Sequence, residues 1–271
     1  MTPTRRLAAL RDAAFNTARL PAWAVVCDLS TDVLAFDEER AAEAEGDREG
    51  GPRRLDAAVA ATLGDFDVTV TPRGRVAEAS IIRALVGPQQ VVLANEVYVT
   101  AAWSIQREGA RVVELPGSIV ACPGRGPIES LDVDAAARRL VRENVACLWL
   151  TTPRVLLSDK GGAALELENL RELAALRDSA APALPIVVDA TKIGEWAARS
   201  GAPPEVALRA LGGLADVLVL SARKDLGGVP RGLLLRRRGV LASSDQRDMF
   251  QRQAWAGEAR HPDALARGVE G

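Results

Sequence analysis

The chain has 271 residues, of which 48% are hydrophobic, so it is long enough and apolar enough to bury a large core. Its formal net charge of −2 argues against a protein dedicated to nucleic acids or to membrane surfaces. No apolar run approaches the roughly 20 residues that a membrane-spanning helix needs. The three cysteines are widely spaced, and the one histidine, His261, lies in a polar stretch near the C-terminus. These features argue against a disulfide framework, a histidine-ligated metal site and a histidine-dependent triad, and they predict a cytoplasmic protein.

Hydrophobic spacing predicts the elements of the first third of the chain. We expect a helix at 4–18, a strand at 22–29, a mobile loop at 46–52, a helix at 55–63, a strand at 67–71 and a helix at 76–85. The strand at 22–29 ends in a polar turn that contains Asp28, Thr31 and Asp32.

The remainder alternates between short apolar strands and amphipathic helices. We expect strands at 90–94, 111–115, 146–151, 186–188 and 217–220, helices at 100–109, 133–144, 165–179 and 203–211, and a last strand, antiparallel or at an edge, at 232–238. This order predicts an α/β fold with a mainly parallel sheet flanked by helices. Residues 1–235 would form one cofactor-binding region and residues 236–271 a tail. Ligands of such sheets bind at the carboxyl ends of the strands.

The strand at 217–220 is followed by a lysine, which would lie at the carboxyl end of that strand. It runs into Ser221, Ala222, Arg223, Lys224 and Asp225. Only three of the 34 cationic residues are lysines. Arginine can replace lysine as a surface charge, but it cannot lose a proton in a protein and become an amine nucleophile. We therefore expect Lys224 to form a Schiff base, and the alternative is a chance lysine at a strand end.

Other predicted strand ends supply groups that suit pyridoxal phosphate. Asp189 follows the strand at 186–188, and a carboxylate there could hold the pyridine nitrogen protonated. The turn Arg73-Gly74-Arg75 joins a strand to a helix, so its backbone amides and two guanidinium groups could bind a phosphate. Tyr98, the only tyrosine, follows another strand and could cover the face of the ring.

Three segments resemble motifs of the β-eliminating lyases, the tryptophanase-like pyridoxal phosphate enzymes. Ser221-Ala222-Arg223-Lys224-Asp225 resembles the family's Ser-Ala/Gly-Lys-Lys-Asp, Asp189-Ala190-Thr191-Lys192 resembles Asp-Ala-Thr-Arg, and residues 71–78 resemble Thr-His-Gln-Gly-Arg-Gly-Ala-Glu. The motifs occur in the family's order and cover most of the chain, from about Arg6 to Leu235. The resemblance implies the large domain of a fold-type I enzyme, like that of aspartate aminotransferase.

The resemblance also implies roles for individual residues. Lys224 would bind the cofactor and then remove the α-proton of an amino acid so that a β-substituent, aromatic or other, can leave. The other implied contacts are Asp189 with the pyridine nitrogen, Lys192 near the phenolate oxygen, Tyr98 on the ring, Thr31 near the substrate carboxylate, and Arg73, Gly74, Arg75, Ser221 and Arg223 around the phosphate.

The sequence departs from the family in several places. Family members continue beyond the region matching Gly271 into a small second domain, and we expect no such domain at 236–271. Arg73, Val76 and Lys192 replace a glutamine, a glycine and an arginine. The resemblance implies a homodimer and a monovalent cation, for which Glu49 is a weak candidate.

Two other interpretations remain open. The chain could be a shortened, catalytically altered relative that acts as a scaffold or as one subunit beside a second polypeptide supplying the small domain. It could also be a nucleotide-binding oxidoreductase, although no G-x-G-x-x-G follows the first strand.

Three sets of residues are expected to have no role in the site. We expect Trp23, Trp103, Trp149 and Trp196 to pack in the core or between helices. Arg236-Arg237-Arg238 is expected to be a solvated strand end, and Lys160 a loop charge.

Overall fold

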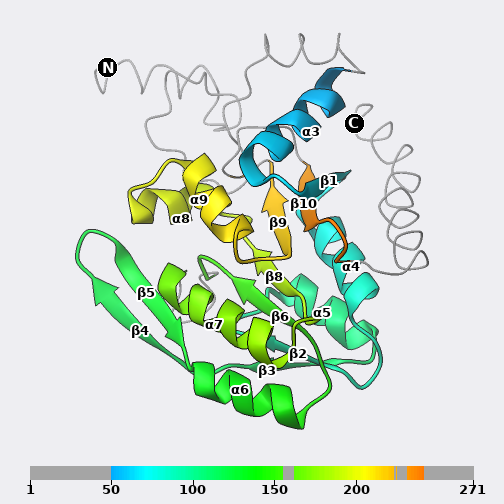
Figure 1. Ribbon diagram of the computed structural model, residues 1–271, viewed down its shortest axis with the longest axis vertical. Helices are drawn as coiled ribbons and strands as arrows, with labels where there is room; N and C mark the ends of the chain where they lie inside the picture. Colours follow the sequence, from blue (N-terminus) through cyan, green and yellow to red (C-terminus); the bar gives the residue numbers. More distant parts are fainter. Residues whose placement is uncertain (1–49, 155–161, 223, 225–230, 241–271) are drawn as a thin grey trace, which may run out of the picture.

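The computed structural model describes residues 50–154, 162–222, 224 and 231–240 (Figure 1). The elements expected before residue 50 lie outside these residues, as do residues 241–271 of the expected C-terminal tail, Trp23 and Lys160.

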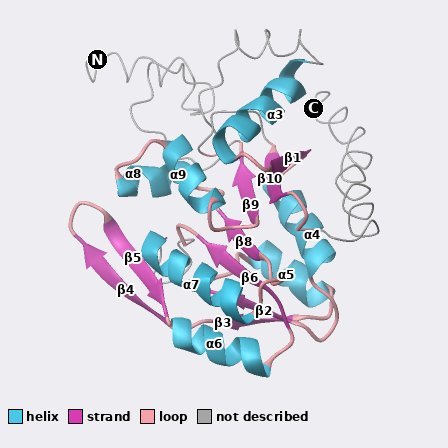
Figure 2. Cartoon of the chain, in the orientation of Figure 1, coloured by secondary structure: helices cyan, strands magenta, loops and turns pink. Residues whose placement is uncertain are grey.

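A seven-stranded sheet forms the centre of the molecule, in the order β1-β10-β9-β8-β6-β2-β3 (Figure 2). Its strands are β1 (Phe66–Thr71), β10 (Gly232–Arg237), β9 (Val217–Ser221), β8 (Ile186–Asp189), β6 (Val145–Thr151), β2 (Val91–Ala94) and β3 (Arg111–Glu114). The five strands from β9 to β3 are parallel, and β10 runs antiparallel to both of its neighbours. The predicted mainly parallel sheet is thus confirmed. The strand expected at 232–238 is antiparallel, and it lies inside the sheet rather than at its edge.

Helices cover both faces of the sheet because neighbouring side chains of a strand point to opposite sides. Val92 and Ala94 pack with α4 (Gly74–Leu85) and α5 (Val99–Arg107), whereas Leu93 belongs to the core on the other face. The helices that contribute to that second core are α3 (Gly50–Leu63), α6 (Val133–Arg142), α7 (Leu167–Ala180), α8 (Ile193–Ser200) and α9 (Pro204–Gly212). Burial on both faces explains why the central strands are continuously apolar.

A second, three-stranded sheet was not predicted. It consists of β4 (Gly117–Cys122), β5 (Gly126–Leu131) and β7 (Ala164–Leu165), in the order β4-β5-β7. β4 and β5 form an antiparallel hairpin with positive φ at Gly124 and Gly126. The side chain of Asn169 on α7 accepts a hydrogen bond from the amide of Leu131 and donates one to its carbonyl, at 2.7 and 3.0 Å. This side chain therefore joins the hairpin to a helix of the main sheet.

Three further features differ from what the sequence predicted. Residues 50–52 belong to α3 and not to a loop, since a proline is tolerated in a first helical turn. The helix α8 was missed because it is short and follows Asp189 closely. Trp149 and Trp196 are buried as expected, but the side chain of Trp103 is exposed beneath Arg107.

The arginines at the end of β10 are paired rather than merely solvated. Arg237 donates hydrogen bonds to the carbonyls of Gly212 and Ala215 and forms an ion pair with Asp216. Arg236 and Arg238 form ion pairs with Asp67 on the neighbouring strand β1.

Within the described residues, every helix is too short or too polar to cross a membrane.

Gly232 allows a turn to pack directly on the first residue of β10. A Cβ atom added there would lie 2.5 Å from Thr71 Oγ1 and 2.6 Å from the backbone of Arg73. We expect Gly232→Ala to lower the free energy of unfolding by about 1–3 kcal/mol, because the crowded atoms belong to the backbone and to a buried side chain. Urea denaturation would measure the change.

Gly213→Ala is the matched control. Gly213 has right-handed helical dihedral angles, and a Cβ atom there would make ordinary contacts of 3.5 Å or more. Equal denaturation midpoints for the two variants would contradict the packing argument.

Candidate functional site

The register of three strands brings distant segments of the chain together at one edge of the sheet. This edge is the one at which the parallel strands have their carboxyl ends. Thr71 at the end of β1 lies opposite Gly232 at the start of β10, and Gly232 lies opposite Ser221 at the end of β9. Because β10 is antiparallel to both neighbours, β1 and β9 end at the same edge, and so does β8 with Asp189. The turn after β1 and the segment after β9 therefore lie on either side of Gly232, the first residue of β10, which has no side chain.

The turn after β1 forms a candidate anion site. Arg73 is the N-cap residue of α4, and its side chain does not cap the helix. Its carbonyl accepts hydrogen bonds from the amides of Val76 and Ala77, while helix geometry leaves the amides of Gly74 and Arg75 without an intrahelical acceptor. These amides, the positive end of the helix dipole and the exposed guanidinium groups of Arg73 and Arg75 all favour an anion.

The hydroxyl of Thr71 fixes this turn, and the space beside Gly74 is open. The hydroxyl of Thr71 donates to the carbonyl of Arg73 at 2.9 Å and also lies 3.2 Å from the carbonyl of Gly232. A Cβ atom at Gly74 would meet nothing within 4 Å, so the space beside the first helical turn is open.

Asp189 is a buried carboxyl group at the end of β8. Its side chain is 3% exposed, and its Oδ1 accepts a hydrogen bond from the amide of Thr191 at 3.1 Å. Burial raises the pKa of Asp189, and the Thr191 contacts and the positive charge of Lys224 oppose that rise. A buried carboxyl group of this kind is stabilised by a cationic or hydrogen-bonding partner.

Lys224 lies three residues beyond the end of β9 and is partly buried. Its charge acts on both Asp189 and Glu78, so the amine lies near two buried carboxyl groups. The amide of Ala222 donates to the carbonyl of Arg231 at 2.9 Å, which ties the two ends of the connection that carries Lys224.

Tyr98 and Lys192 also lie at helix starts at this edge of the sheet. Tyr98 is the N-cap residue of α5 and is partly buried. Lys192 is the N-cap residue of α8, and its Nζ lies 3.3 Å from a carboxylate oxygen of Glu195, an ion pair that the sequence did not predict.

Some predicted residues lie outside the described part of the chain. These are Thr31, Asp32, Arg223 and Glu49. Among the described residues, no group of histidine, cysteine, aspartate and glutamate side chains could hold a metal ion.

Glu78 is a site residue to which the sequence reasoning gave no role, although it ends the segment 71–78 that resembles a family motif. It lies on α4, is 5% exposed, and accepts a hydrogen bond from Thr100 Oγ1 at 2.8 Å. The signal in the sequence is its place three and four residues before Ile81 and Ile82, which are both fully buried. A carboxyl group on the apolar face of an amphipathic helix needs a polar partner, and here it faces the site.

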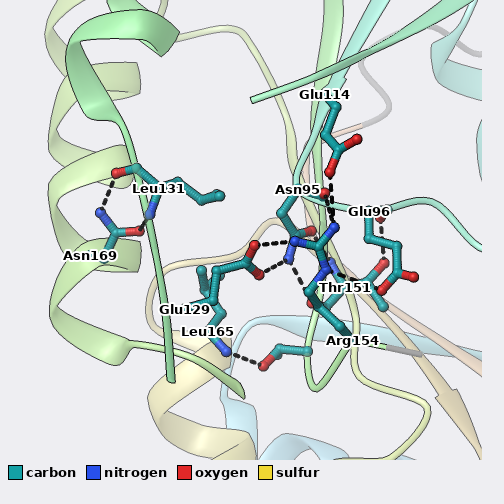
Figure 3. A network of polar contacts seen from close by, with 10 residues as sticks. Asn95, Glu96, Glu114, Glu129, Leu131, Thr151, Arg154, Leu165 and Asn169 are labelled. Atoms are coloured by element: carbon teal, nitrogen blue, oxygen red, sulfur yellow. Dashed lines mark hydrogen bonds and ion pairs between the residues drawn. The ribbon is translucent and has the colours of Figure 1, made fainter. Parts of the chain in front are cut away.

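A polar network beside the site was also missed (Figure 3). Arg154, which is 7% exposed, forms ion pairs with Glu96, Glu114 and Glu129 and donates to the carbonyl of Asn95 at 2.8 Å. It therefore joins the ends of β2 and β3 to the hairpin strand β5.

Asn95 extends the same network to the neighbouring strand. Its Nδ2 donates to Glu129 Oε2 at 2.7 Å and to the carbonyl of Thr151 at 3.0 Å, and its Oδ1 accepts from the amide of Thr151 at 2.8 Å. The network thereby fixes the segment that leads from β2 to Tyr98.

Known folds resemble this arrangement. A solved threonine aldolase from Leishmania major has a TM-score of 0.60 at 14% identity, covering 83% of this chain and 66% of that chain. A SepCysS complex with the SepCysE N-terminal domain has a TM-score of 0.51 at 12% identity, covering 80% and 60%. A methionine gamma lyase, CalE6 from Micromonospora echinospora, in its apo form, has a TM-score of 0.50 at 21% identity, covering 84% and 55%. The chain thus spans about half to two thirds of these structures.

Two sequence comparisons complete the picture. A family model described as beta-eliminating lyase matches residues 36–263, which is most of the chain. No curated protein matches the sequence.

Arg154 compensates the buried charge of Glu129, whose residue is 1% exposed. We expect Arg154→Leu to lower the free energy of unfolding by about 3–5 kcal/mol at pH 8, because an unpaired carboxylate would remain buried. Burial already raises the pKa of Glu129 from its ordinary value of 4.5, and losing Arg154 removes a contribution that lowers it.

The loss should therefore be smaller at pH 5. A carboxyl group with a raised pKa in the folded state is most favourable below its unfolded pKa, and its contribution is lost as the pH rises through the folded pKa. Urea denaturation at both pH values measures this difference. Arg171→Leu, which removes an exposed pair with Glu168, is the control and should cost less than about 1 kcal/mol. An equal loss at both pH values would contradict the argument.

Proposed function

The chain belongs to the β-eliminating lyase family, and from this membership we propose that it is a pyridoxal phosphate-dependent lyase that removes a β-substituent from an amino acid. The single observation that supports the proposal most strongly is the meeting of three groups at one edge of the sheet. These are the anion site at the start of α4, the buried carboxyl group of Asp189 and the amine of Lys224.

The cofactor of this family is pyridoxal phosphate, and the described residues fit it. The open turn at Gly74, with the amides of Gly74 and Arg75, has the chemistry for a phosphate. Asp189 would accept a hydrogen bond from the pyridine nitrogen, and Lys224 would supply the amine that reacts with the aldehyde.

Other residues would complete the cofactor site. Ser221 lies beside Gly232 in the sheet, next to the turn, and would contact the phosphate together with Arg73 and Arg223. Tyr98 would lie against the ring. Lys192 would approach the phenolate oxygen, and its ion pair with Glu195 would hold it in place.

When bound, pyridoxal phosphate supplies an electron sink that makes the α-proton of an amino acid acidic. In the proposed reaction the amino group of the substrate would replace Lys224 on the cofactor, and the released Lys224 Nζ would take that proton as a general base while the β-substituent leaves. Asp189 in its ionised form would hold the proton on the pyridine nitrogen. Thr31 would contact the substrate carboxylate.

The covalent role of Lys224 can be tested directly. We expect the purified protein with added pyridoxal phosphate to absorb visible light through a lysine-linked cofactor, and we expect Lys224→Ala to lose this band. Borohydride should fix the cofactor to Lys224, and peptide mapping can identify the position because the chain has only three lysines.

Lys192→Ala is the matched control and should keep the covalent link. A band that persists in Lys224→Ala, or a cofactor fixed to another lysine, would refute the assignment of Lys224.

Asp189 should matter more for turnover than for the covalent link. Replacing its carboxylate with an amide in Asp189→Asn removes a hydrogen bond to a charged partner, which is worth about 1.5–3 kcal/mol. We therefore expect kcat to fall by roughly 10- to 100-fold or more, while the absorbance of the linked cofactor remains. Pyruvate and ammonia released from a panel of amino acids would be measured.

Release of neither product from any β-substituted amino acid by the cofactor-loaded wild-type protein would contradict the proposed reaction. Unchanged turnover in Asp189→Asn would contradict only the role of Asp189.

A further inference from the structure

The segment between β2 and α5 leads to Tyr98, and its first two residues are fixed to the end of β6 (Figure 3). Asn95 directly follows β2 and is fully buried. Its side chain bonds to the backbone of Thr151 as a strand would, because Oδ1 accepts from the amide at 2.8 Å and Nδ2 donates to the carbonyl at 3.0 Å. The hydroxyl of Thr151 also donates to the carbonyl of Glu96 at 2.8 Å. The sheet pairing thus continues beyond the last residue of β2.

Arg154 holds the same two residues through its guanidinium group. Nη2 donates to the carbonyl of Asn95 at 2.8 Å, and Nε lies 3.4 Å from a carboxylate oxygen of Glu96. The remaining contacts of the group are ion pairs with Glu114 at the end of β3 and with Glu129 on β5. One buried side chain therefore ties the start of the segment to two other strands.

Only Val97 separates this anchored pair of residues from Tyr98. Val97 is partly buried against the core beneath α4 and α5. The carbonyl of Tyr98 accepts the first hydrogen bond of α5, from the amide of Ala102 at 2.9 Å. The chain between the two anchors is too short to absorb a displacement, since each residue has only two soft dihedral angles. A shift of Glu96 must therefore move Tyr98.

The oxygen atoms around Arg154 require a guanidinium group. They come from four residues on three elements, namely Asn95, Glu96, Glu114 and Glu129. Arginine has five donors in a rigid planar fork, whereas lysine has a compact ammonium group on a flexible stem. Lysine at this position would keep the charge that the buried Glu129 needs but would lose the contacts that fix the segment.

We infer that Arg154 is a positioning residue of the cofactor site, which sets the place of Tyr98 through the carbonyl of Asn95 and the carboxylate of Glu96. The inference rests on the proposed function, in which Tyr98 lies against the cofactor ring. It gives the network a second task beside the compensation of buried charge.

The first test uses the cofactor-free protein. Tyr98 is the only tyrosine of the chain, so protein grown with isotope-labelled tyrosine gives ring resonances from this one residue. We expect Arg154→Lys to shift these resonances by more than their line width, or to broaden them, while urea denaturation shows that the variant is folded. Unchanged resonances in the folded variant would overturn the inference.

Arg177→Lys is the matched control. Arg177 is also a buried arginine that pairs with a carboxylate, Asp216, and donates to a carbonyl, that of Leu184, at 3.1 Å. Asp216 directly precedes β9, so this cluster lies at the opposite edge of the sheet. The control should leave the Tyr98 resonances in place. Equal shifts in the two variants would show a general loosening of the fold and would contradict the inference.

Glu96→Ala answers the same question if Arg154→Lys is too unstable to measure. It removes a contact of the segment and leaves Arg154 paired with Glu114 and Glu129. The Tyr98 resonances should again shift, and their persistence at the wild-type positions would count against the inference.

The second test measures the affinity for pyridoxal phosphate by absorbance titration in a double-mutant cycle. Arg154→Lys should weaken binding by roughly 3- to 10-fold, the range of an aromatic contact. In a Tyr98→Leu background the same substitution should change the affinity by less than about 2-fold, because the residue through which Arg154 acts is gone. A merely structural role would weaken binding equally in both backgrounds.

The outcomes separate the two proposals. Equal losses of affinity with and without Tyr98 would overturn the role of Arg154 at the cofactor. A wild-type protein with no absorbance from bound cofactor would overturn the proposed function, whereas the resonances of the cofactor-free protein would still decide whether Arg154 sets the place of Tyr98.

Discussion

The contact between the turn after β1 and the first residue of β10 determines how the candidate site is assembled. Thr71, Gly232 and Ser221 lie side by side on three neighbouring strands, and the backbone of Arg73 rests where a side chain of Gly232 would be. The antiparallel direction of β10 is necessary for this contact, because it places the start of one strand beside the ends of two others. A parallel strand in that position would bring its own following loop into the space used by the anion turn.

Buried charge is the second constraint on this edge of the sheet. Asp189, Glu78 and Glu129 are all less than 6% exposed, and each would be unfavourable if it were isolated. Lys224 balances the first two, and Arg154 balances the third. The two groups of charges are linked through Glu96, which pairs with Arg154 and also acts on Asp189. Because Glu96 and Asp189 carry like charges, it is the ion pair with Arg154, and not the interaction with Asp189, that holds the segment from β2 to Tyr98.

The sequence predicted the alternating strands and helices, but it missed the contacts between charged side chains that are far apart in the chain. The strands that contain Val91, Ile186 and Val217 were predicted because burial on both faces makes them uniformly apolar. Their order in the sheet explains why Asp189 and Lys224 lie at one edge, as expected for strand ends.

The missed features have physical reasons of their own. Arg154 is one arginine among many in the sequence, and only the folded chain shows that three carboxylates surround it. Glu78 could have been found as a charge on an apolar helix face, but its neighbours Asp189 and Lys224 are more than 100 residues away. The β4–β5 hairpin has mostly exposed or partly exposed side chains, so it lacks the apolar alternation by which strands are recognised.

The two faces of the sheet have different consequences for engineering. The anion turn, Glu78, Thr100 and Tyr98 all belong to α4, α5 or their first turns, which pack on one face. Among the site residues named here, the helices of the opposite face contribute only Lys192, at the start of α8. A programme of thermostabilisation could therefore redesign the core around Leu170, Leu173 and Leu211 while leaving the candidate site almost untouched. Changes around Ile81 and Ile105, by contrast, would have to be screened for cofactor affinity as well as for melting temperature.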